Sequence, residues 1–171
     1  MTSHLNLFGG KIKVFSQAEL KHSIKIETTP EKIWGFFTDL DKNYTTWHPE
    51  DHISFQWIKG KPLEEGTTFY AEQYVKGKIT KFKGHCEEII PNRKIVFKFS
   101  FPISLVSPKV EWQIESKGSS CIFTAITYMR WGRFFQKLLK KHMKDSIELH
   151  DKHVGAEGEN LKKILENKDN G

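Results

Sequence analysis

The chain has 171 residues, of which 37% are hydrophobic and 13% are aromatic, and it carries a formal net charge of +6 at pH 7. This length and composition predict one folded domain and exclude an intrinsically disordered chain, and the modest charge, without a basic motif interleaved with aromatic residues, does not indicate nucleic-acid binding. Two cysteines without metal-ligand spacing, no signal-peptide pattern and no apolar run long enough for a bilayer predict a cytoplasmic protein without a membrane span.

The first predicted elements are a strand and two short helices. Residues 1–19 are a weakly specified lead-in, and the alternation of apolar and polar residues in His22–Glu27 predicts a strand. Pro30 follows a threonine cap and precedes an acidic residue, a pattern typical of a helix start. A second short helix is expected from Asp39 and ends before His48, because the residue before a proline avoids the helical conformation.

A run of strands and one long amphipathic helix, Arg133–Asn167, follow. Together they predict a single domain over residues 20–167, with a disordered tail at 168–171. This order predicts an α+β fold and resembles the helix-grip fold of the START-like (SRPBCC) superfamily, in which a curved antiparallel sheet wraps a long C-terminal helix around a ligand cavity. The predicted strands are Ile53–Lys59, Thr67–Val75, Ile79–Ile89, Lys94–Phe101, Lys109–Glu115 and Cys121–Trp131.

Ionisable residues lie on the apolar stripe of the predicted C-terminal helix. At about 100° per residue, His150, His153 and Glu157 fall on this stripe, where a charge is costly unless it is paired or binds a metal. His153 and Glu157 are four residues apart and so share one side of the helix, which suits chelation of one metal ion or a simple histidine–glutamate hydrogen bond. The apolar members of the stripe are Phe135, Leu139, Met143, Ile147, Val154, Leu161, Ile164 and Leu165.

Partners for these groups are available earlier in the chain. The loop before the first long strand offers His48 and His52, and the strand acid Glu72 lies between two tyrosines. Each of these has an ordinary alternative, as a solvated loop histidine or a surface glutamate. Mixed imidazole and carboxylate ligands predict Zn²⁺, with Fe²⁺ or Mn²⁺ as alternatives. His150 is a candidate ligand, an outer partner of a ligand, or a core histidine.

Three segments together resemble the 2,4-diacetylphloroglucinol hydrolase family. They are Trp-His-Pro-x-Asp-His at residues 47–52, a glutamate on the following strand, and His-x-x-x-Glu-Gly-x-Asn-Leu-Lys from His153. Members of this family are zinc-dependent hydrolases of a carbon–carbon bond on a START-like fold, with a metal held by two histidines and two glutamates. The resemblance therefore implies that Glu72, His153 and Glu157 bind zinc together with His48 or His52. This chain has a shorter N-terminal portion than the characterised hydrolase.

The resemblance implies hydrolysis of an acyl group attached to an activated aromatic ring. Tyr44 or His150 is then the acid that protonates the departing ring. The expected partner is a small hydrophobic or aromatic ligand, and a homodimer is a further candidate assembly. Two other functions fit the same fold: a non-catalytic carrier of a hydrophobic small molecule, and a metal-free polyketide cyclase.

Overall fold

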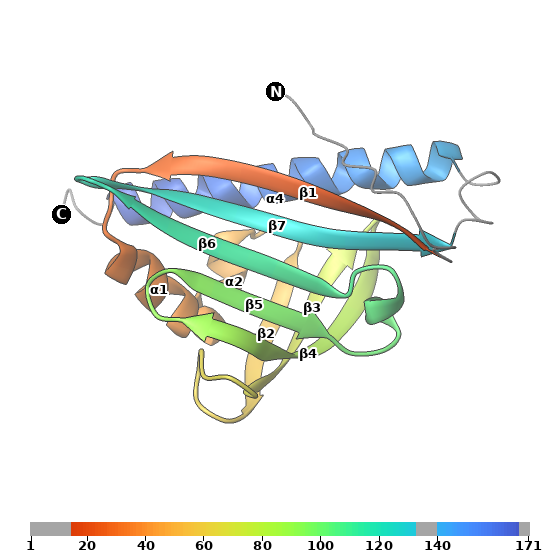
Figure 1. The fold of residues 1–171 in the computed structure, drawn as a ribbon, viewed down its shortest axis with the longest axis horizontal. Coiled ribbons are helices and arrows are strands. Elements are labelled where there is room, and N and C mark those ends of the chain that lie inside the picture. Colours follow the sequence, from red (N-terminus) through yellow and green to blue (C-terminus); the bar gives the residue numbers. More distant parts are fainter. Residues whose placement is uncertain (1–14, 133–139, 168–171) are drawn as a thin grey trace, which may run out of the picture.

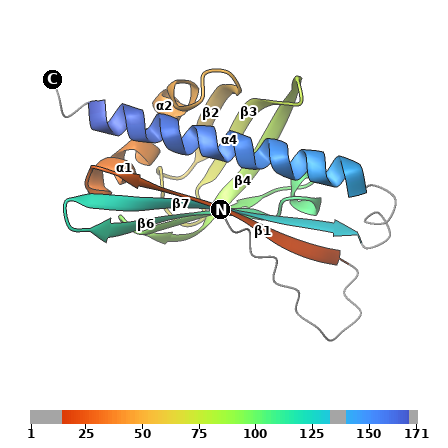
Figure 2. The ribbon, with the colours of Figure 1, turned by 90° about the horizontal axis from the view of Figure 1, so that it is seen from above.

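A curved antiparallel sheet carries a long helix across one face. The computed structural model describes residues 15–132 and 140–167, and within them seven strands pair in the order β1-β7-β6-β5-β4-β3-β2. Helix α4 crosses one face, here called the inner face, and α1 and α2 lie at one end of the sheet (Figure 1, Figure 2). The elements are β1 (Phe15–Ile26), α1 (Pro30–Thr38), α2 (Leu40–Trp47), β2 (His52–Lys59), β3 (Thr68–Val75), β4 (Lys78–Ile90), β5 (Lys94–Phe99), the 3₁₀ turn η1 (Ile103–Leu105), β6 (Lys109–Lys117), β7 (Ser120–Gly132) and α4 (Lys140–Asn167).

The predicted α+β order is confirmed, with the largest difference at β1. This strand begins at Phe15 instead of His22, so residues 15–19 belong to the sheet and not to a lead-in. It pairs with β7 along its whole length, from Phe15 opposite Gly132 to Ile26 opposite Cys121. A long partner strand provides hydrogen bonds to residues whose own alternation is weak, which local sequence patterns do not show. The short turn η1 was not predicted.

The C-terminal helix is described from Lys140 onward. Residues 133–139, including Phe135 and Leu139 of the predicted stripe, lie outside the described residues, as do the side chain of Met143 and the predicted tail at 168–171. The later part of the stripe faces inward as predicted. Its buried members are Val154, Leu161 and Leu165.

Aromatic side chains fix the two short helices to the inner face. Phe37 of α1 stacks on Trp112 of β6 with ring centroids 4.3 Å apart, and it meets Trp47 of α2 edge-on at 5.4 Å. Trp47 is only 2% exposed. Burial of such large rings contributes several kcal/mol to stability. The packing therefore holds the end of α2, and the loop that follows it, in a defined position beside the sheet.

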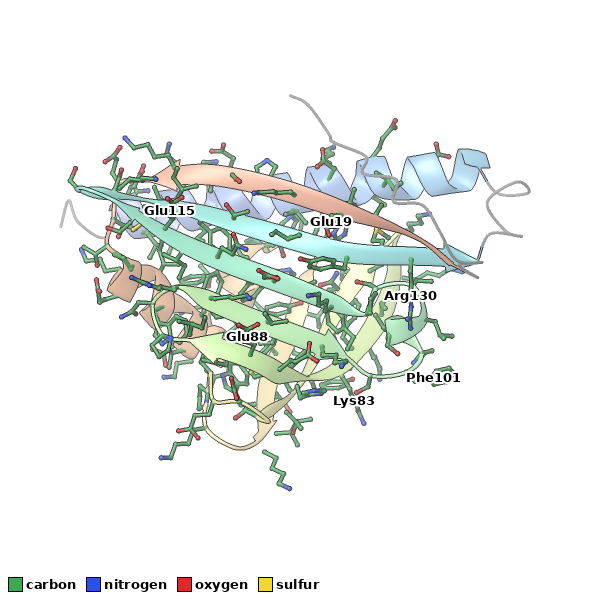
Figure 3. All side chains as sticks on the ribbon, viewed as in Figure 1. Glu19, Lys83, Glu88, Phe101, Glu115 and Arg130 are labelled. Carbon is green, nitrogen blue, oxygen red and sulfur yellow. The ribbon has the colours of Figure 1, made fainter. Side chains whose placement is uncertain are left out.

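The outer face of the sheet is charged. Figure 3 shows side chains such as Glu88 and Lys83 on this side. Lys94 pairs with Glu88 across neighbouring strands at 2.9 Å, and Lys83 lies over the ring of Tyr70. Cross-strand pairs of this kind are typical of a solvated sheet face. The inner face is therefore the side of the sheet that can hold an apolar ligand away from solvent.

Two glycines let α4 approach β1 closely. A Cβ atom at Gly155 would lie 3.3 Å from Nε2 of His22, and one at Gly158 would lie 3.5 Å from Cγ2 of Ile24. The helix therefore rests against β1 side chains at these positions. By contrast, a Cβ atom at Gly84 of β4 would lie 2.3 Å from the main-chain oxygen of Lys98, which cannot move aside without disturbing the sheet.

This geometry predicts opposite effects of two glycine-to-alanine substitutions. Gly158→Ala places its methyl group at an ordinary contact distance and improves helix propensity, so we expect the free energy of unfolding to stay the same or rise by up to about 1 kcal/mol. Gly84→Ala should lower it by about 1–3 kcal/mol through overpacking. Urea unfolding of both variants checks this, and equal effects would contradict the packing described here.

Candidate metal centre

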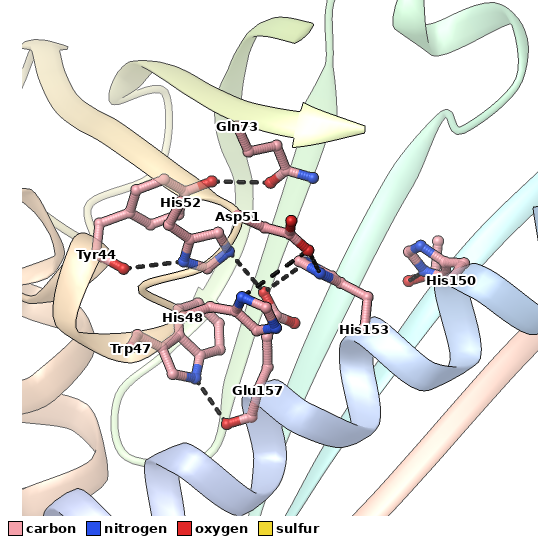
Figure 4. Close-up of polar contacts among 10 residues, drawn as sticks. Tyr44, Trp47, His48, Asp51, His52, Gln73, His150, His153 and Glu157 are labelled. Atoms are coloured by element: carbon pink, nitrogen blue, oxygen red, sulfur yellow. Dashed lines mark hydrogen bonds and ion pairs between the residues drawn. The ribbon is translucent and has the colours of Figure 1, made fainter. Parts of the chain in front are cut away.

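Residues from three elements meet beneath α4. His48 and Asp51 come from the loop after α2, His52 begins β2, and His153 and Glu157 project from α4 (Figure 4). The indole N–H of Trp47 donates a hydrogen bond of 2.9 Å to the main-chain oxygen of Glu157. This bond joins the end of α2 directly to the helix that carries the other half of the site.

Main-chain hydrogen bonds hold the loop in one conformation. The amides of Asp51 and His52 both donate to the carbonyl oxygen of His48, at 3.2 and 2.9 Å, and the amide of Tyr74 donates to the carbonyl oxygen of Asp51 at 2.8 Å. The register of β2 against β3 shifts between His52 and Ser54. Irregularities of this kind redirect a side chain at the start of a strand. The loop and the shift together aim His52 toward α4.

His52 is buried, with one ring nitrogen satisfied and the other facing a carboxylate. Its Nδ1 donates to the carbonyl oxygen of Tyr44 at 2.9 Å, and its ring lies 3.8 Å from the Tyr44 ring and parallel to it. In the neutral ring Nε2 then carries the lone pair. Nε2 is 3.0 Å from Oε1 of Glu157 yet makes no hydrogen bond. A proton or a metal ion between these two atoms would offset the repulsion of their lone pairs.

His153 has the same arrangement with a different outer partner. Its Nδ1 donates to Oδ2 of Asp51 at 2.9 Å, and its Nε2 lies 3.3 Å from Oε1 of Glu157. Burial alone would lower the pKa of His153, but Glu157 and Asp51 outweigh it and raise that pKa. Burial would also raise the pKa of Glu157, but His153 and His52 hold it well below its usual range. Glu157 is therefore an ionised carboxylate that lies between the imidazoles of His52 and His153.

The separations of these groups fit one metal ion. One ligand atom from each of His52, His153 and Glu157 lies within 4.8 Å of the others. Tetrahedral zinc with bonds of about 2.0–2.1 Å places its ligands roughly 3.3 Å apart, close to the 3.0 and 3.3 Å found here. Each histidine also gives its other N–H to an oxygen, as metal-binding histidines do. Three protein ligands leave a position for water or substrate.

His48 and Asp51 form a second group around His153. His48 is 5% exposed, its Nδ1 has no hydrogen-bond partner, and this atom lies 3.9 Å from Oδ2 of Asp51. Burial, followed by the neighbouring His153 and His52, lowers the pKa of His48. The structure thus brings both alternative histidines to the site, with His52 beside Glu157. Asp51 was not predicted as a site residue, although its place three residues after His48 was a usable signal.

Glu72 does not lie at the site, and its prediction as a metal ligand is wrong. Its neighbours on β3, Ala71 and Gln73, face the cavity, so Glu72 points to the outer face. There it accepts a hydrogen bond from Tyr70, which lowers its pKa, and its Oε1 lies 3.4 Å from Nζ of Lys81. The ligand role of Glu72 was implied by the resemblance to the hydrolase family, and alternation alone does not tell which strand face is inward.

The inner face holds a partly open cavity of about 300 Å³ beside this centre. His153 and Glu157 are among its lining residues. Tyr44 also lines it and donates to Oε1 of Gln73 at 2.9 Å; burial, followed by Glu157 and Asp51, raises the pKa of Tyr44, so it is a neutral phenol. His150 lines the cavity one turn earlier on α4 (Figure 4).

Comparisons with known proteins agree with the fold. Residues 27–166 match the family described as Activator of Hsp90 ATPase homolog 1-like protein. The chain belongs to this family. A search of curated proteins gave no match. No helix within residues 15–132 and 140–167 has the length and apolar character needed to cross a bilayer.

Several solved structures share the helix-grip architecture. The di-domain aromatase/cyclase StfQ of the steffimycin pathway superposes with a TM-score of 0.72 at 11% identity, covering 91% of this chain and 52% of that one. Norcoclaurine synthase from Thalictrum flavum gives 0.68 at 13% identity, covering 91% and 98%. The aromatase/cyclase ZhuI from Streptomyces sp. R1128 gives 0.66 at 12% identity, covering 88% and 94%. The predicted START-like fold is confirmed, and the diacetylphloroglucinol hydrolase resemblance stays a prediction.

The charge of Glu157 predicts a pH dependence of stability in chelator-treated protein. The unfolded chain protonates this group near its ordinary value of 4.5, whereas the folded protein keeps it ionised to lower pH. The contribution of ionised Glu157 to the free energy of unfolding is therefore present above about pH 4.5 and is lost as the pH falls. We expect the free energy of unfolding of Glu157→Gln to fall less than that of the unsubstituted protein as the pH is lowered from 6 to 3. Glu159→Gln, at an exposed position on the same helix, is the control; identical curves for both variants would contradict the assignment.

Proposed function

We propose that this protein is a zinc-dependent hydrolase that cleaves the bond between an acyl carbon and an aromatic ring in a small molecule. The observation that carries the proposal is the buried, unpartnered Nε2 of His52, which faces Glu157 at 3.0 Å beside His153. A buried imidazole nitrogen without a hydrogen-bond partner, beside a carboxylate and a second imidazole, favours a metal ion over a simple polar contact. Zinc is the metal that two histidines and one glutamate suit best.

The surrounding cavity supports an aromatic substrate. Its lining includes rings such as Phe97 and Trp112, which offer stacking surfaces and exclude water. The same fold in norcoclaurine synthase from Thalictrum flavum has been solved with dopamine and hydroxybenzaldehyde. An acyl-aromatic compound would therefore find a suitable environment against the metal centre.

The reaction adds water to the acyl carbon and breaks the carbon–carbon bond, with its electron pair left on the ring. The ring carbon then takes up a proton, and the products are a carboxylic acid and the deacylated ring. A zinc ion bound at this site would supply Lewis acidity toward the acyl oxygen and activation of a water molecule.

The chain's own residues have separate tasks in this proposal. Asp51 orients His153 through the hydrogen bond to Nδ1, and the carbonyl oxygen of Tyr44 does the same for His52. The neutral phenol of Tyr44 can turn its O–H from Gln73 to a substrate in the cavity and donate a proton there, and His150 is the alternative donor. The inward position beside Glu72 carries Gln73, so the proposed set has one glutamate, not two.

A metal-free cyclase or a ligand carrier is the second candidate. Two of the structural relatives are aromatase/cyclases, and an apolar cavity alone is sufficient for a carrier. In that case His48 and His153 would act as ordinary buried imidazoles. Metal content separates this candidate from the hydrolase without any assumption about the substrate.

The ligand set predicts which substitutions remove zinc. Purified protein should contain about one equivalent of zinc, and His52→Ala, His153→Ala and Glu157→Gln should each reduce it to a small fraction. Glu72→Gln should keep it, because that side chain lies on the outer face. Elemental analysis of folded variants measures this. Zinc loss in Glu72→Gln, or full zinc in Glu157→Gln, would refute the assignment.

The reaction predicts equal amounts of acetate and deacylated ring from an acetylated trihydroxybenzene. We expect chelation to abolish the reaction and added zinc to restore it. Tyr44→Phe should keep its zinc and lower kcat by about 10²-fold or more if the phenol is the acid. An unchanged kcat in this variant would leave His150 as the proton donor. Turnover by metal-free protein would contradict the proposed mechanism.

A further inference from the structure

The cavity has two polar walls with an aromatic floor between them. Tyr44 and Gln73 form one polar pair beside Glu157. The other pair is His150 and Thr127, joined by a hydrogen bond of 2.8 Å between Nε2 and Oγ1. Gln73 lies on β3 and Thr127 on β7, and the sheet order places β4, β5 and β6 between them. Figure 4 shows His150 apart from the metal centre, one turn along α4.

We propose that this cavity selects an uncharged aromatic molecule with hydrogen-bonding groups on opposite sides of its ring, one of them bound by the His150–Thr127 pair. The other group lies beside Glu157 and Tyr44; its identity as an acyl oxygen rests on the proposed function. The His150–Thr127 pair is thus a specificity-determining subsite for a ring hydroxyl or a similar neutral group.

The charge of the residues that line the cavity supports the selection of an uncharged ligand. Among the described residues, no lysine or arginine lines the cavity, and its one carboxylate is Glu157. An anionic ligand would therefore lack a counter-ion among these residues away from the metal centre, and an unpaired carboxylate is poorly tolerated in an apolar cavity. The cationic side chains among the described residues thus lie away from the ligand.

The position of the His150–Thr127 pair supports its role as a subsite for one polar group of the ligand. Thr127 is only 4% exposed and its neighbours along β7, Ala125 and Met129, face the same cavity. A hydroxyl can take part in up to three hydrogen bonds, so its bond to His150 leaves it able to bind a ligand. His150 and Glu157 are seven residues apart, about 10.5 Å along the helix axis, so the two polar pairs lie at separate places along the cavity.

The size of the cavity limits the ligand further. About 300 Å³ is at the lower end of the range for small-molecule sites. Rings from the intervening strands, including Phe82, Phe97 and Phe99, supply the flat surface between the two polar pairs. One or two fused rings with polar groups at both ends match this arrangement.

Displacement of the uncharged fluorescent probe N-phenyl-1-naphthylamine from chelator-treated full-length protein tests this inference. The competitors are acetophenone, 4-hydroxyacetophenone and 4-acetylbenzoate, which differ only in the group opposite the acetyl. We expect 4-hydroxyacetophenone to bind about tenfold more tightly than acetophenone, as one added hydrogen bond of about 1.4 kcal/mol allows. 4-Acetylbenzoate should bind at least about tenfold more weakly than the hydroxyl compound.

Matched variants assign the effect to the subsite. Thr127→Val should abolish the preference for the hydroxyl compound while acetophenone binds as before, and Thr127→Ser should retain the preference. Thr80→Val, at another cavity-lining threonine, should also retain it. Equal binding of the carboxylate, no binding of the probe and the hydroxyl compound, or an unchanged preference in Thr127→Val would overturn the inference. Because metal is absent, a failure to bind zinc would refute the hydrolase without affecting this result.

Discussion

The structure depends on an ionised carboxylate enclosed between two imidazoles. Glu157 lies within 3.3 Å of nitrogens from both His52 and His153, while its main-chain oxygen accepts the indole N–H of Trp47. A buried carboxylate is tolerated only when its environment compensates its charge. The single residue thus ties the segment after α2 to a helix more than a hundred residues later in the chain, and this contact places a cluster of ionisable groups at the cavity.

The scaffold explains how this cluster is held in place. The packing of Phe37 and Trp47 fixes α2, main-chain bonds fix the loop, and Gly155 with Gly158 lets α4 rest on β1. Each imidazole then has its outer N–H committed to an oxygen, so its inner nitrogen has one direction available. Preorganisation of this kind is what a metal site or a catalytic centre requires. The charged outer face of the sheet plays no part in it.

Sequence patterns predicted most of the fold. They also predicted the part of the site that lies on the C-terminal helix. Apolar periodicity showed that His153 and Glu157 face inward, since a helix has one buried stripe. The strand half was harder, because alternation on β3 gives two faces without saying which is buried, and the ligand role that the resemblance implied for Glu72 did not fit the outer face. Asp51 was overlooked because its role comes from a tertiary hydrogen bond to His153. The length of β1 likewise comes from its pairing with β7 and not from its own residues.

Membership of the Activator of Hsp90 ATPase homolog 1-like family and the START-like fold are compatible with binders and enzymes alike. The proposed hydrolase function depends on a metal ion bound by His52, His153 and Glu157. Anomalous diffraction at the zinc edge from crystals grown with zinc tests this most directly. The account predicts one strong peak bonded to a nitrogen of each histidine and an oxygen of Glu157. No peak at this position, or a peak that does not contact Glu157, would contradict it.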